Sequence, residues 1–422
     1  MRWVVSALAG LAAAASLAAA PATPASAQAG APDLDADAWL LIDADDGERL
    51  ASNAPSRPLA IASATKLMTA YLALKELPLD RRLTAPQYDA LPAESILGLR
   101  AGERATVENL LYSLILASAN DSAVTLAEGV SGSVPAFVDR MNATAERLGL
   151  DDTSYTNPIG LDAPGNRSSA RDLAALAGRL MRDKLFRRIA DSTEATIETD
   201  QRTISIPTRN TLLLSDPTLT GIKTGHTLEA GYVLVGSATR DDVDLISVVL
   251  GAPSESARDV ETAELLDYGF SSYTRRTPVR AGEVLAEPEL AYQDESLRLV
   301  ADEQLRVAVR DDQEVSTDVD APEELVGPIE RGEKLGTVTV TVDGRREGSA
   351  DLVASRSAET ATFTEKVRSR FLSSSALIVV GVLVILVALL LATRRGKKQR
   401  TAEERMRSRE ERTRRRGDGG GE

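Results

Sequence analysis

The stretch Ile61-Ala62-Ser63-Ala64-Thr65-Lys66-Leu67-Met68-Thr69 places a serine at the start of a predicted helix. Apolar side chains continue from it at helical spacing through Leu74, so we expect the helix to begin near Ser63. Residues three apart share one face of a helix, which puts Lys66 beside the Ser63 hydroxyl. A serine hydroxyl is a weak nucleophile at neutral pH, and a neighbouring lysine can be its base. Alone, the stretch is equally typical of a helix N-cap followed by a solvated lysine.

Two further motifs follow, Ser118-Ala119-Asn120 and Lys223-Thr224-Gly225, the second extended by His226 and Thr227. His226 is the single histidine of the chain, and no Ser-His-Asp set can be read around it. Each short motif can arise by chance, but the three in this order and spacing argue against coincidence. They supply a nucleophile, a general base, a proton relay at Ser118 and a clamp for a carboxylate.

The motifs resemble those of the D-alanyl-D-alanine carboxypeptidases, low-molecular-mass penicillin-binding proteins of the Ser-x-x-Lys serine peptidase type. The similarity runs from about Trp39 to Phe270. It implies an α+β fold, a penicillin-binding/β-lactamase-like transpeptidase domain with an antiparallel sheet and a helical cluster, then a small all-β domain. Other matching stretches are Asn157-Pro158-Ile159-Gly160-Leu161-Asp162, Ser168-Ser169-Ala170-Arg171-Asp172, Thr208-Arg209-Asn210-Thr211-Leu212-Leu213 and Lys223 through Tyr232.

The resemblance implies a membrane-anchored enzyme that removes the terminal D-alanine from peptidoglycan stem pentapeptides and so regulates cross-linking. It would work through an acyl-enzyme on Ser63, with β-lactams as covalent inhibitors and with neither metal nor cofactor. Asn120 would hold the peptide amide, and the backbone N–H groups of Ser63 and His226 would form an oxyanion hole. The residues implied in substrate binding are Lys223, Thr224, Gly225, His226 and Thr227, with Thr227 a helper at the carboxylate.

The chain departs from the family where many relatives carry an arginine after the strand that follows the Lys-Thr-Gly motif. Here that stretch reads Gly251-Ala252-Pro253, and Arg258 is near but out of register. Two alternatives stay open: a class A-like β-lactamase and a catalytically silent wall-binding receptor. The lactamase would carry Ser-Asp-Asn and a glutamate in the loop that follows, whereas 155–172 contains none. The receptor would be free to lose Lys66 or Ser118.

Several local elements are predicted from periodicity and turn residues. A hairpin joins Trp39–Ile42 to Arg49–Ala51. A helix begins near Thr106, and Asp121 caps the helix after the Ser118 loop. Strands 231–238 and 244–250 form a second hairpin, which can join the first in one sheet. Residues 276–356 alternate with period two and predict the small β-rich domain, without a candidate active site.

The two ends of the chain predict export and anchoring. Residues 1–27 resemble a signal peptide ending in Ala25-Ser26-Ala27. Residues 376–392 are apolar and predict a transmembrane helix, followed by a basic, disordered tail at 393–422. The positive-inside rule then places the tail in the cytoplasm and the catalytic domain, expected at 38–272, outside the cell membrane. Residues 357–375 read as a linker.

The composition of the chain limits the classes of partner that it can bind and the way in which its fold is stabilised. The formal net charge is −14, which disfavours nucleic acid as a ligand. The chain has no cysteine, so an exported domain must rely on its hydrophobic core rather than on disulfides. Its length is ample for such a core.

Overall fold

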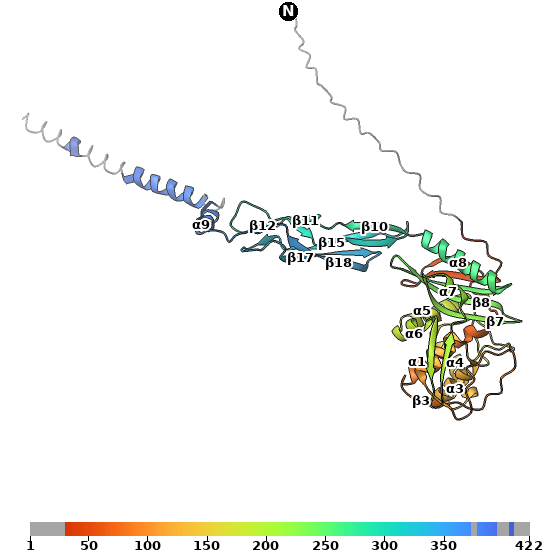
Figure 1. The fold of residues 1–422 in the computed structure, drawn as a ribbon. Helices are drawn as coiled ribbons and strands as arrows, with labels where there is room; N and C mark the ends of the chain where they lie inside the picture. The colour runs from red at the N-terminus through yellow and green to blue at the C-terminus, as the bar shows by residue number, and fades with distance from the viewer. Residues whose placement is uncertain (1–29, 373–377, 395–404, 409–422) are drawn as a thin grey trace, which may run out of the picture. The chain divides into compact units, whose positions relative to one another are not determined.

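The computed structural model describes residues 30–372, 378–394 and 405–408, and the predicted signal peptide lies outside them. The chain divides into two compact units between Tyr273 and Thr274 (Figure 1). Each unit has its own hydrophobic core, so we describe the two separately.

The first unit is built on a five-stranded antiparallel sheet of order β2-β1-β9-β8-β7. Strands β1 (Ala38–Asp43) and β2 (Arg49–Asn53) form the predicted first hairpin, and β8 (Gly231–Arg240) and β9 (Val243–Ala252) form the second. Strand β1 pairs with β9, which confirms that the strands from both ends of this unit share one sheet. Strand β7 (Leu219–Thr227) is the edge strand beside β8.

The two faces of the sheet follow from the alternation of side chains along β9. Leu245 lies against Gly269 of α8 (Glu255–Ser271), where an added Cβ would be 2.7 Å from a Leu245 methyl carbon. Ile246, the next residue, points to the opposite face and lies near Gly178 of α5 (Ala170–Met181). The sheet therefore lies between α8 and a helical cluster on its other face (Figure 1).

The helical cluster and its short hairpins occupy the middle of the sequence. Helix α2 begins directly after Thr106, whose side chain accepts a hydrogen bond from Asn109 N–H, as predicted for an N-cap. Long apolar stripes such as Leu110, Leu111 and Leu114 are fully buried in the main core. The remaining elements are η1 (Ala62–Thr65), α1 (Lys66–Glu76), β3 (Arg82–Thr84), β4 (Arg104–Thr106), α2 (Val107–Leu116), α3 (Asn120–Ser131), α4 (Val134–Leu148), α6 (Lys184–Ala190), β5 (Glu194–Glu198), β6 (Thr203–Pro207) and α7 (Thr211–Ser215).

The second unit is all-β up to helix α9. A five-stranded sheet of order β11-β13-β18-β17-β15 is joined by the strand pairs β10–β14 and β12–β16. Val338 and Val340 of β17 are buried while the neighbouring Thr337 and Thr339 are partly exposed, the alternation expected of a half-buried sheet. The elements are β10 (Thr274–Val279), β11 (Val284–Ala286), β12 (Glu289–Leu290), β13 (Leu299–Ala301), β14 (Leu305–Val309), β15 (Val315–Asp320), β16 (Glu324–Leu325), β17 (Lys334–Val342), β18 (Arg345–Ala354) and α9 (Phe363–Leu372).

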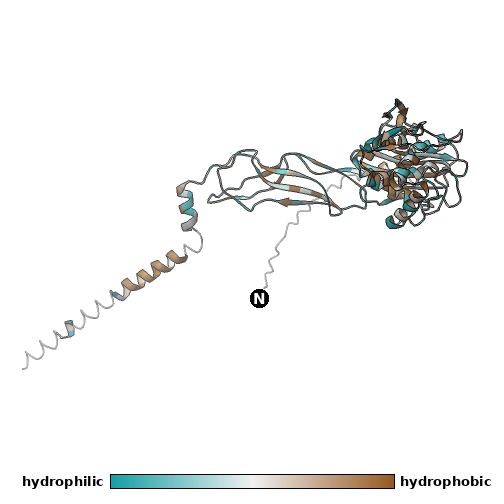
Figure 2. Ribbon diagram, turned by 90° about the horizontal axis from the view of Figure 1, so that it is seen from below, coloured by the Kyte–Doolittle hydropathy of each residue, from teal (hydrophilic) through white to brown (hydrophobic). Residues whose placement is uncertain are grey.

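The expected transmembrane helix at 376–392 is not supported, and this part of the predicted fold is wrong. Residues 378–394 form a helix of mostly hydrophobic residues (Figure 2). Within the described ranges, however, no helix combines the length and the apolar character that a membrane crossing requires. Crossing the hydrocarbon core takes about 20 apolar residues at 1.5 Å each, and the described part of this helix, 378–394, includes the polar residues Thr393 and Arg394. Of the expected tail, 405–408 are helical, and 395–404 and 409–422 lie outside the described residues.

Candidate active site

Ser63 and Lys66 are brought together at the junction of η1 and α1. The Lys66 Nζ donates a hydrogen bond to the Ser63 Oγ at 3.0 Å. Ser63 is partly exposed, whereas Lys66 is fully buried. The short 3₁₀ turn that carries Ser63 precedes the α-helix proper, which begins at Lys66. The sequence spacing therefore becomes direct contact between a hydroxyl and an amine.

A loop from Asn157 to Leu161 packs against this junction and holds Lys66. The Ile159 carbonyl accepts a second hydrogen bond from Lys66 Nζ. Asn157 Oδ1 accepts from Gly160 N–H at 2.7 Å and so shapes the turn. Gly160 has φ +86°, and a Cβ there would lie 1.9 Å from the Ala62 carbonyl oxygen. Only glycine allows this approach, so the matching stretch 157–162 holds Lys66 in place.

Ser118 and Asn120 lie at the turn between α2 and α3, and Asn120 is linked to Lys66 through Glu94. Both are buried, and Ser118 adopts φ 58°, a left-handed conformation that is unusual for a serine. The predicted capping role of Asp121 is wrong. The N-cap position of α3 is Ala119, which has no capping side chain, and the Asp121 carboxylate instead accepts hydrogen bonds from the backbone N–H groups of Leu97, Gly98 and Leu99 at 2.7–2.9 Å. Asp121 thus fixes the loop around residues 97–99 beside the start of α3.

That loop contributes Glu94, a residue that we did not predict. The Glu94 carboxylate accepts a hydrogen bond from Asn120 Nδ2 at 2.7 Å and another from the Tyr88 hydroxyl. Burial acts to raise the pKa of Glu94, but the hydrogen bonds from Tyr88 and Asn120 outweigh it, so its pKa is lowered and it is ionised at neutral pH. A lone glutamate in a charged loop carries no sequence signal, which explains the omission.

Strand β7 brings the Lys-Thr-Gly motif against η1. A Cβ on Gly225 would lie 3.0 Å from both the Ala62 Cβ and the Ser63 backbone nitrogen, so glycine permits the close approach of the strand. His226 stacks on Tyr232 with ring centroids 4.1 Å apart. Thr227 Oγ1 donates to Asp162 Oδ1 at 2.6 Å, so in this structure its hydroxyl is committed to the loop and not free to help at a carboxylate.

Lys223 is 1 % exposed, and its Nζ donates to the Thr224 carbonyl at 2.8 Å. Burial, helped by the nearby charges of Arg209 and Arg258, lowers the pKa of Lys223 to about 7. Burial also lowers the pKa of Lys66 well below its ordinary value, and the Lys223 charge is the next cause. Glu94 acts in the opposite direction on Lys66. Lys66 therefore loses its proton more readily than an exposed lysine does.

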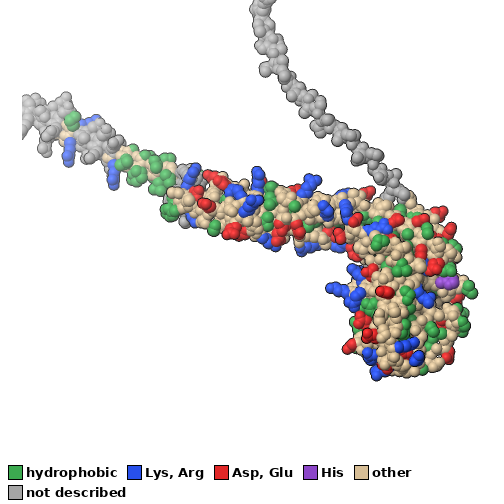
Figure 3. All heavy atoms as spheres, in the orientation of Figure 1, with side chains coloured by type: hydrophobic (Ala, Val, Ile, Leu, Met, Phe, Trp, Pro, Cys, Tyr) green, Lys and Arg blue, Asp and Glu red, His purple; other side chains and the backbone are tan. Residues whose placement is uncertain are grey.

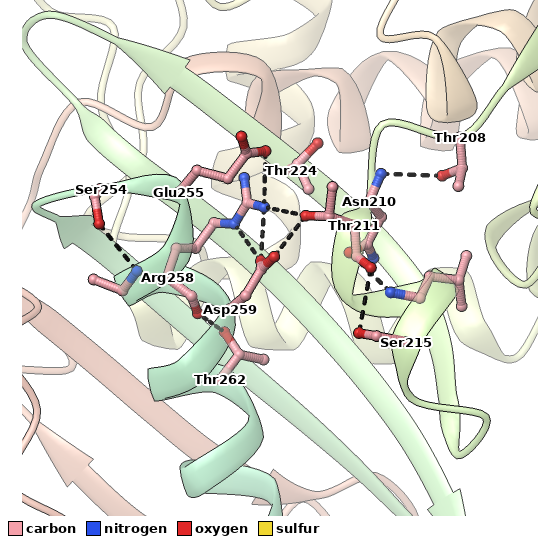
Figure 4. Close-up of polar contacts among 12 residues, drawn as sticks. Thr208, Asn210, Thr211, Ser215, Thr224, Ser254, Glu255, Arg258, Asp259 and Thr262 are labelled. Atoms are coloured by element: carbon pink, nitrogen blue, oxygen red, sulfur yellow. Dashed lines mark hydrogen bonds and ion pairs between the residues drawn. The ribbon is translucent and has the colours of Figure 1, made fainter.

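Many relatives carry an arginine where this chain has residues 251–253. Arg258 does not take its place, because it is not a free cation. It is 2 % exposed in the first turn of α8 and donates to Asp259 Oδ1 at 2.7 Å and to Glu255 Oε1 at 3.3 Å (Figure 4). It also donates to Thr211 Oγ1 at 3.2 Å, and Thr211 in turn donates to Asp259. Arg258 is already paired with two carboxylates. It therefore influences Lys223 only through its charge, which lowers the pKa of that lysine.

Arg209 is better placed than Arg258 to supply a second positive charge beside Lys223. It lies just before α7, where its backbone N–H donates to the Leu116 carbonyl at 3.0 Å. Its side chain is exposed, and its charge lowers the pKa values of both Lys66 and Lys223. The part of the chain that the structure describes contains no group of three or more His, Cys, Asp or Glu side chains that could hold a metal ion.

Comparisons with known proteins agree with this geometry. Residues 25–254 match the family model described as D-alanyl-D-alanine carboxypeptidase, and residues 273–360 match that of the penicillin-binding protein 5 C-terminal domain. The chain is 34 % identical over 354 residues to the D-alanyl-D-alanine carboxypeptidase DacC of Escherichia coli strain K12, covering 80 % of this chain and 88 % of the relative. It is 29 % identical over 334 residues to DacF of Bacillus subtilis strain 168, covering 77 % and 86 %.

Among solved structures, penicillin-binding protein 5 of Haemophilus influenzae matches with a TM-score of 0.55 and 32 % identity, covering 78 % of this chain and 98 % of the other. The Streptomyces K15 DD-transpeptidase matches with a TM-score of 0.55 and 32 % identity, covering 57 % and 99 %.

Proposed function

Since the chain belongs to the D-alanyl-D-alanine carboxypeptidase family of serine peptidases, we propose that it removes the terminal D-alanine of peptidoglycan stem pentapeptides through an acyl-enzyme on Ser63. The observation that carries this proposal is the 3.0 Å contact between Lys66 Nζ and Ser63 Oγ. A buried lysine with a lowered pKa takes the hydroxyl proton as Ser63 attacks the carbonyl between the two D-alanines.

The leaving amine needs a proton when the peptide bond breaks. Ser118, buried at the turn before α3, relays a proton toward it. The backbone N–H groups of Ser63 and His226 stabilise the oxyanion, because Gly225 lets β7 approach η1 closely. Water then attacks the acyl group and frees the shortened peptide and Ser63.

The substrate carboxylate is recognised by the Lys-Thr-Gly motif of β7. Lys223 and Thr224 form the clamp, and Arg209 adds the charge that the stretch Gly251-Ala252-Pro253 does not supply. Because the substrate is a wall polymer, we place the catalytic unit outside the cytoplasm. Shortening the pentapeptide removes the D-Ala-D-Ala bond that cross-linking requires.

The direct test is incubation of the purified chain with a pentapeptide ending in D-Ala-D-Ala. We expect stoichiometric release of free D-alanine, and inhibition after preincubation with penicillin. A matched peptide ending in D-Ala-L-Ala is the control and should release no alanine. Rapid turnover of penicillin without D-alanine release would instead support a β-lactamase.

Glu94 gives a pH-dependent prediction. A carboxylate only accepts hydrogen bonds, so it forces the Asn120 NH₂ group toward Glu94 and leaves Oδ1 for the substrate N–H. Glu94→Gln removes both the charge and this orientation. The Glu94 charge raises the pKa of Lys66, so its loss should lower that pKa and move the acidic limb of the acylation profile to lower pH. We expect kcat/KM for the peptide to fall about tenfold, the effect of one charge-assisted hydrogen bond.

Tyr88→Phe is the matched variant, because it removes a hydrogen bond to Glu94 but keeps the carboxylate charge. The acidic limb of its acylation profile should lie at the same pH as that of the unmodified enzyme. The measurement is the acylation rate with a chromogenic β-lactam from pH 5 to 9. An unchanged limb in Glu94→Gln would contradict the electrostatic role of Glu94.

A further inference from the structure

A second feature of the first unit lies over α5 and α6, away from the predicted catalytic residues. The chain as a whole is acidic, with 63 acidic against 49 basic residues. Residues 170–190 reverse this balance with six basic and two acidic side chains. Figure 3 shows Lys and Arg side chains gathered at the edge of this unit where α5 and α6 lie. The basic residues are Arg171, Arg179, Arg182, Lys184, Arg187 and Arg188.

These side chains border a groove rather than a flat surface. A cavity of about 850 Å³ lies between α5 and the β1–β2 hairpin, and one of about 570 Å³ lies over α6. A smaller cavity of about 100 Å³ shares residues with both. Arg182 lines all three, so we name them together the α5–α6 groove. None of the predicted catalytic or substrate-binding residues lines it.

Much of the positive charge in the groove is not neutralised. Asp172 is 2 % exposed and accepts hydrogen bonds from Thr153 and Arg171, and Asp183 caps α6. Arg171 pairs with Asp152 and Arg188 with Glu108. Among the described residues, no carboxylate pairs with the remaining four cations, although the cavities are also lined by acidic residues, Asp45, Asp46, Glu48, Asp191 and Asp244. The four are Arg179, Arg182, Lys184 and Arg187.

The floor of the larger cavity has a different character. It is formed by aliphatic and small residues, Leu40, Ile42, Ala174, Ala175 and Gly178. None of the large exposed hydrophobic side chains of the described residues borders the groove, so a lipid surface would find no anchor there. An apolar floor with cations on its rim suits a ligand that has both a C–H face and anionic groups.

We propose that the α5–α6 groove binds an acidic glycan, a chain of sugars bearing carboxylate groups. The C–H faces of the sugar rings pack on Ala174, Ala175 and Gly178, and the carboxylates pair with the guanidinium groups of Arg182 and Arg187. A volume of about 850 Å³ lies within the range of small-ligand sites. The rest of the first unit carries more acidic than basic residues and so repels a polyanion, which favours this groove within that unit.

The test is binding of a fluorescently labelled oligogalacturonate to the full chain, measured by fluorescence anisotropy. We expect saturable binding that weakens as salt rises from about 20 to 150 mM, because the contacts are ionic. The double variant Arg182→Glu with Arg187→Glu should bind about tenfold or more weakly, as expected for the loss of two charge-assisted contacts. Its release of D-alanine from a soluble pentapeptide should be unchanged, which separates this proposal from the catalytic one.

The matched control is Arg81→Glu with Arg100→Glu, which makes the same change in charge at two exposed positions outside the groove. The control should bind as the unmodified chain does. Equal losses in both double variants would overturn the groove and leave only an effect of net charge. Equal affinity for polyglutamate of the same charge would overturn recognition of sugars. Circular dichroism melts of both variants check that a loss of binding is not a loss of folding.

Discussion

Ser63→Ala abolishes both covalent labelling by a fluorescent penicillin and release of D-alanine, if Ser63 carries the acyl group. Loss of a serine nucleophile lowers kcat by about 10⁶-fold in comparable enzymes. The fold should survive, because the substitution removes one partly exposed hydroxyl and its hydrogen bond to Lys66, a contribution of about 1 kcal/mol. Intact-mass measurement and peptide mapping of the penicillin adduct are the readouts.

The control for this variant is Ser205→Ala on the exposed face of β6, which should label normally. The mapped adduct of the unmodified enzyme should lie on the peptide that contains Ser63. An adduct on another residue, or labelling that persists in Ser63→Ala, would refute the proposed mechanism.

Lys66 and Lys223 are both buried lysines, but we expect opposite responses to the same substitution. An arginine stays protonated in proteins and can still bind a carboxylate. Lys66→Arg replaces a base by a fixed cation, so acylation should fall by roughly 10²–10⁴-fold, the usual contribution of a general base. Lys223→Arg keeps the cation of the carboxylate clamp. It should retain measurable acylation, with the loss mainly in KM.

The pH profile separates the two roles further. Lys223 is charged below its pKa of about 7 and becomes neutral as the pH rises through that value in the free enzyme. Binding of a substrate carboxylate should therefore weaken above pH 7 in the unmodified enzyme. Lys223→Arg does not titrate in this range and should lose that alkaline limb. The measurement is kcat/KM for the pentapeptide from pH 5 to 9 in the unmodified enzyme and in Lys223→Arg.

Lys75→Arg, on the exposed end of α1, is the matched control and should leave the profile unchanged. Equal and complete loss of acylation in Lys66→Arg and Lys223→Arg would contradict the division of roles.

The two hairpins of the sheet were predictable from local signals, whereas the α+β fold was implied by the family resemblance and the order of the strands came from the structure. The Gly47 turn and the flanking alternation predicted the first hairpin, and the β-rich runs after Gly231 predicted the second. Local signals misled at Asp121, because an acidic residue near a helix start is typical of a cap. In the structure its carboxylate serves the loop at 97–99, more than twenty residues away in sequence. The span expected at 376–392 was likewise inferred from composition, and no described helix meets the requirement.

The sequence by itself determined which chemical groups are present and which of them are neighbours along the chain. Ser63 and Lys66 are three residues apart, so the geometry of a helical turn is enough to pair them. Only the tertiary structure decided their environment. The Ile159 carbonyl, Lys223 and Glu94 reach Lys66 from distant segments, and burial among them shifts its pKa. Desolvation and charge act through space, so neither the pKa shift nor the contact between Glu94 and Asn120 could be read from spacing along the chain.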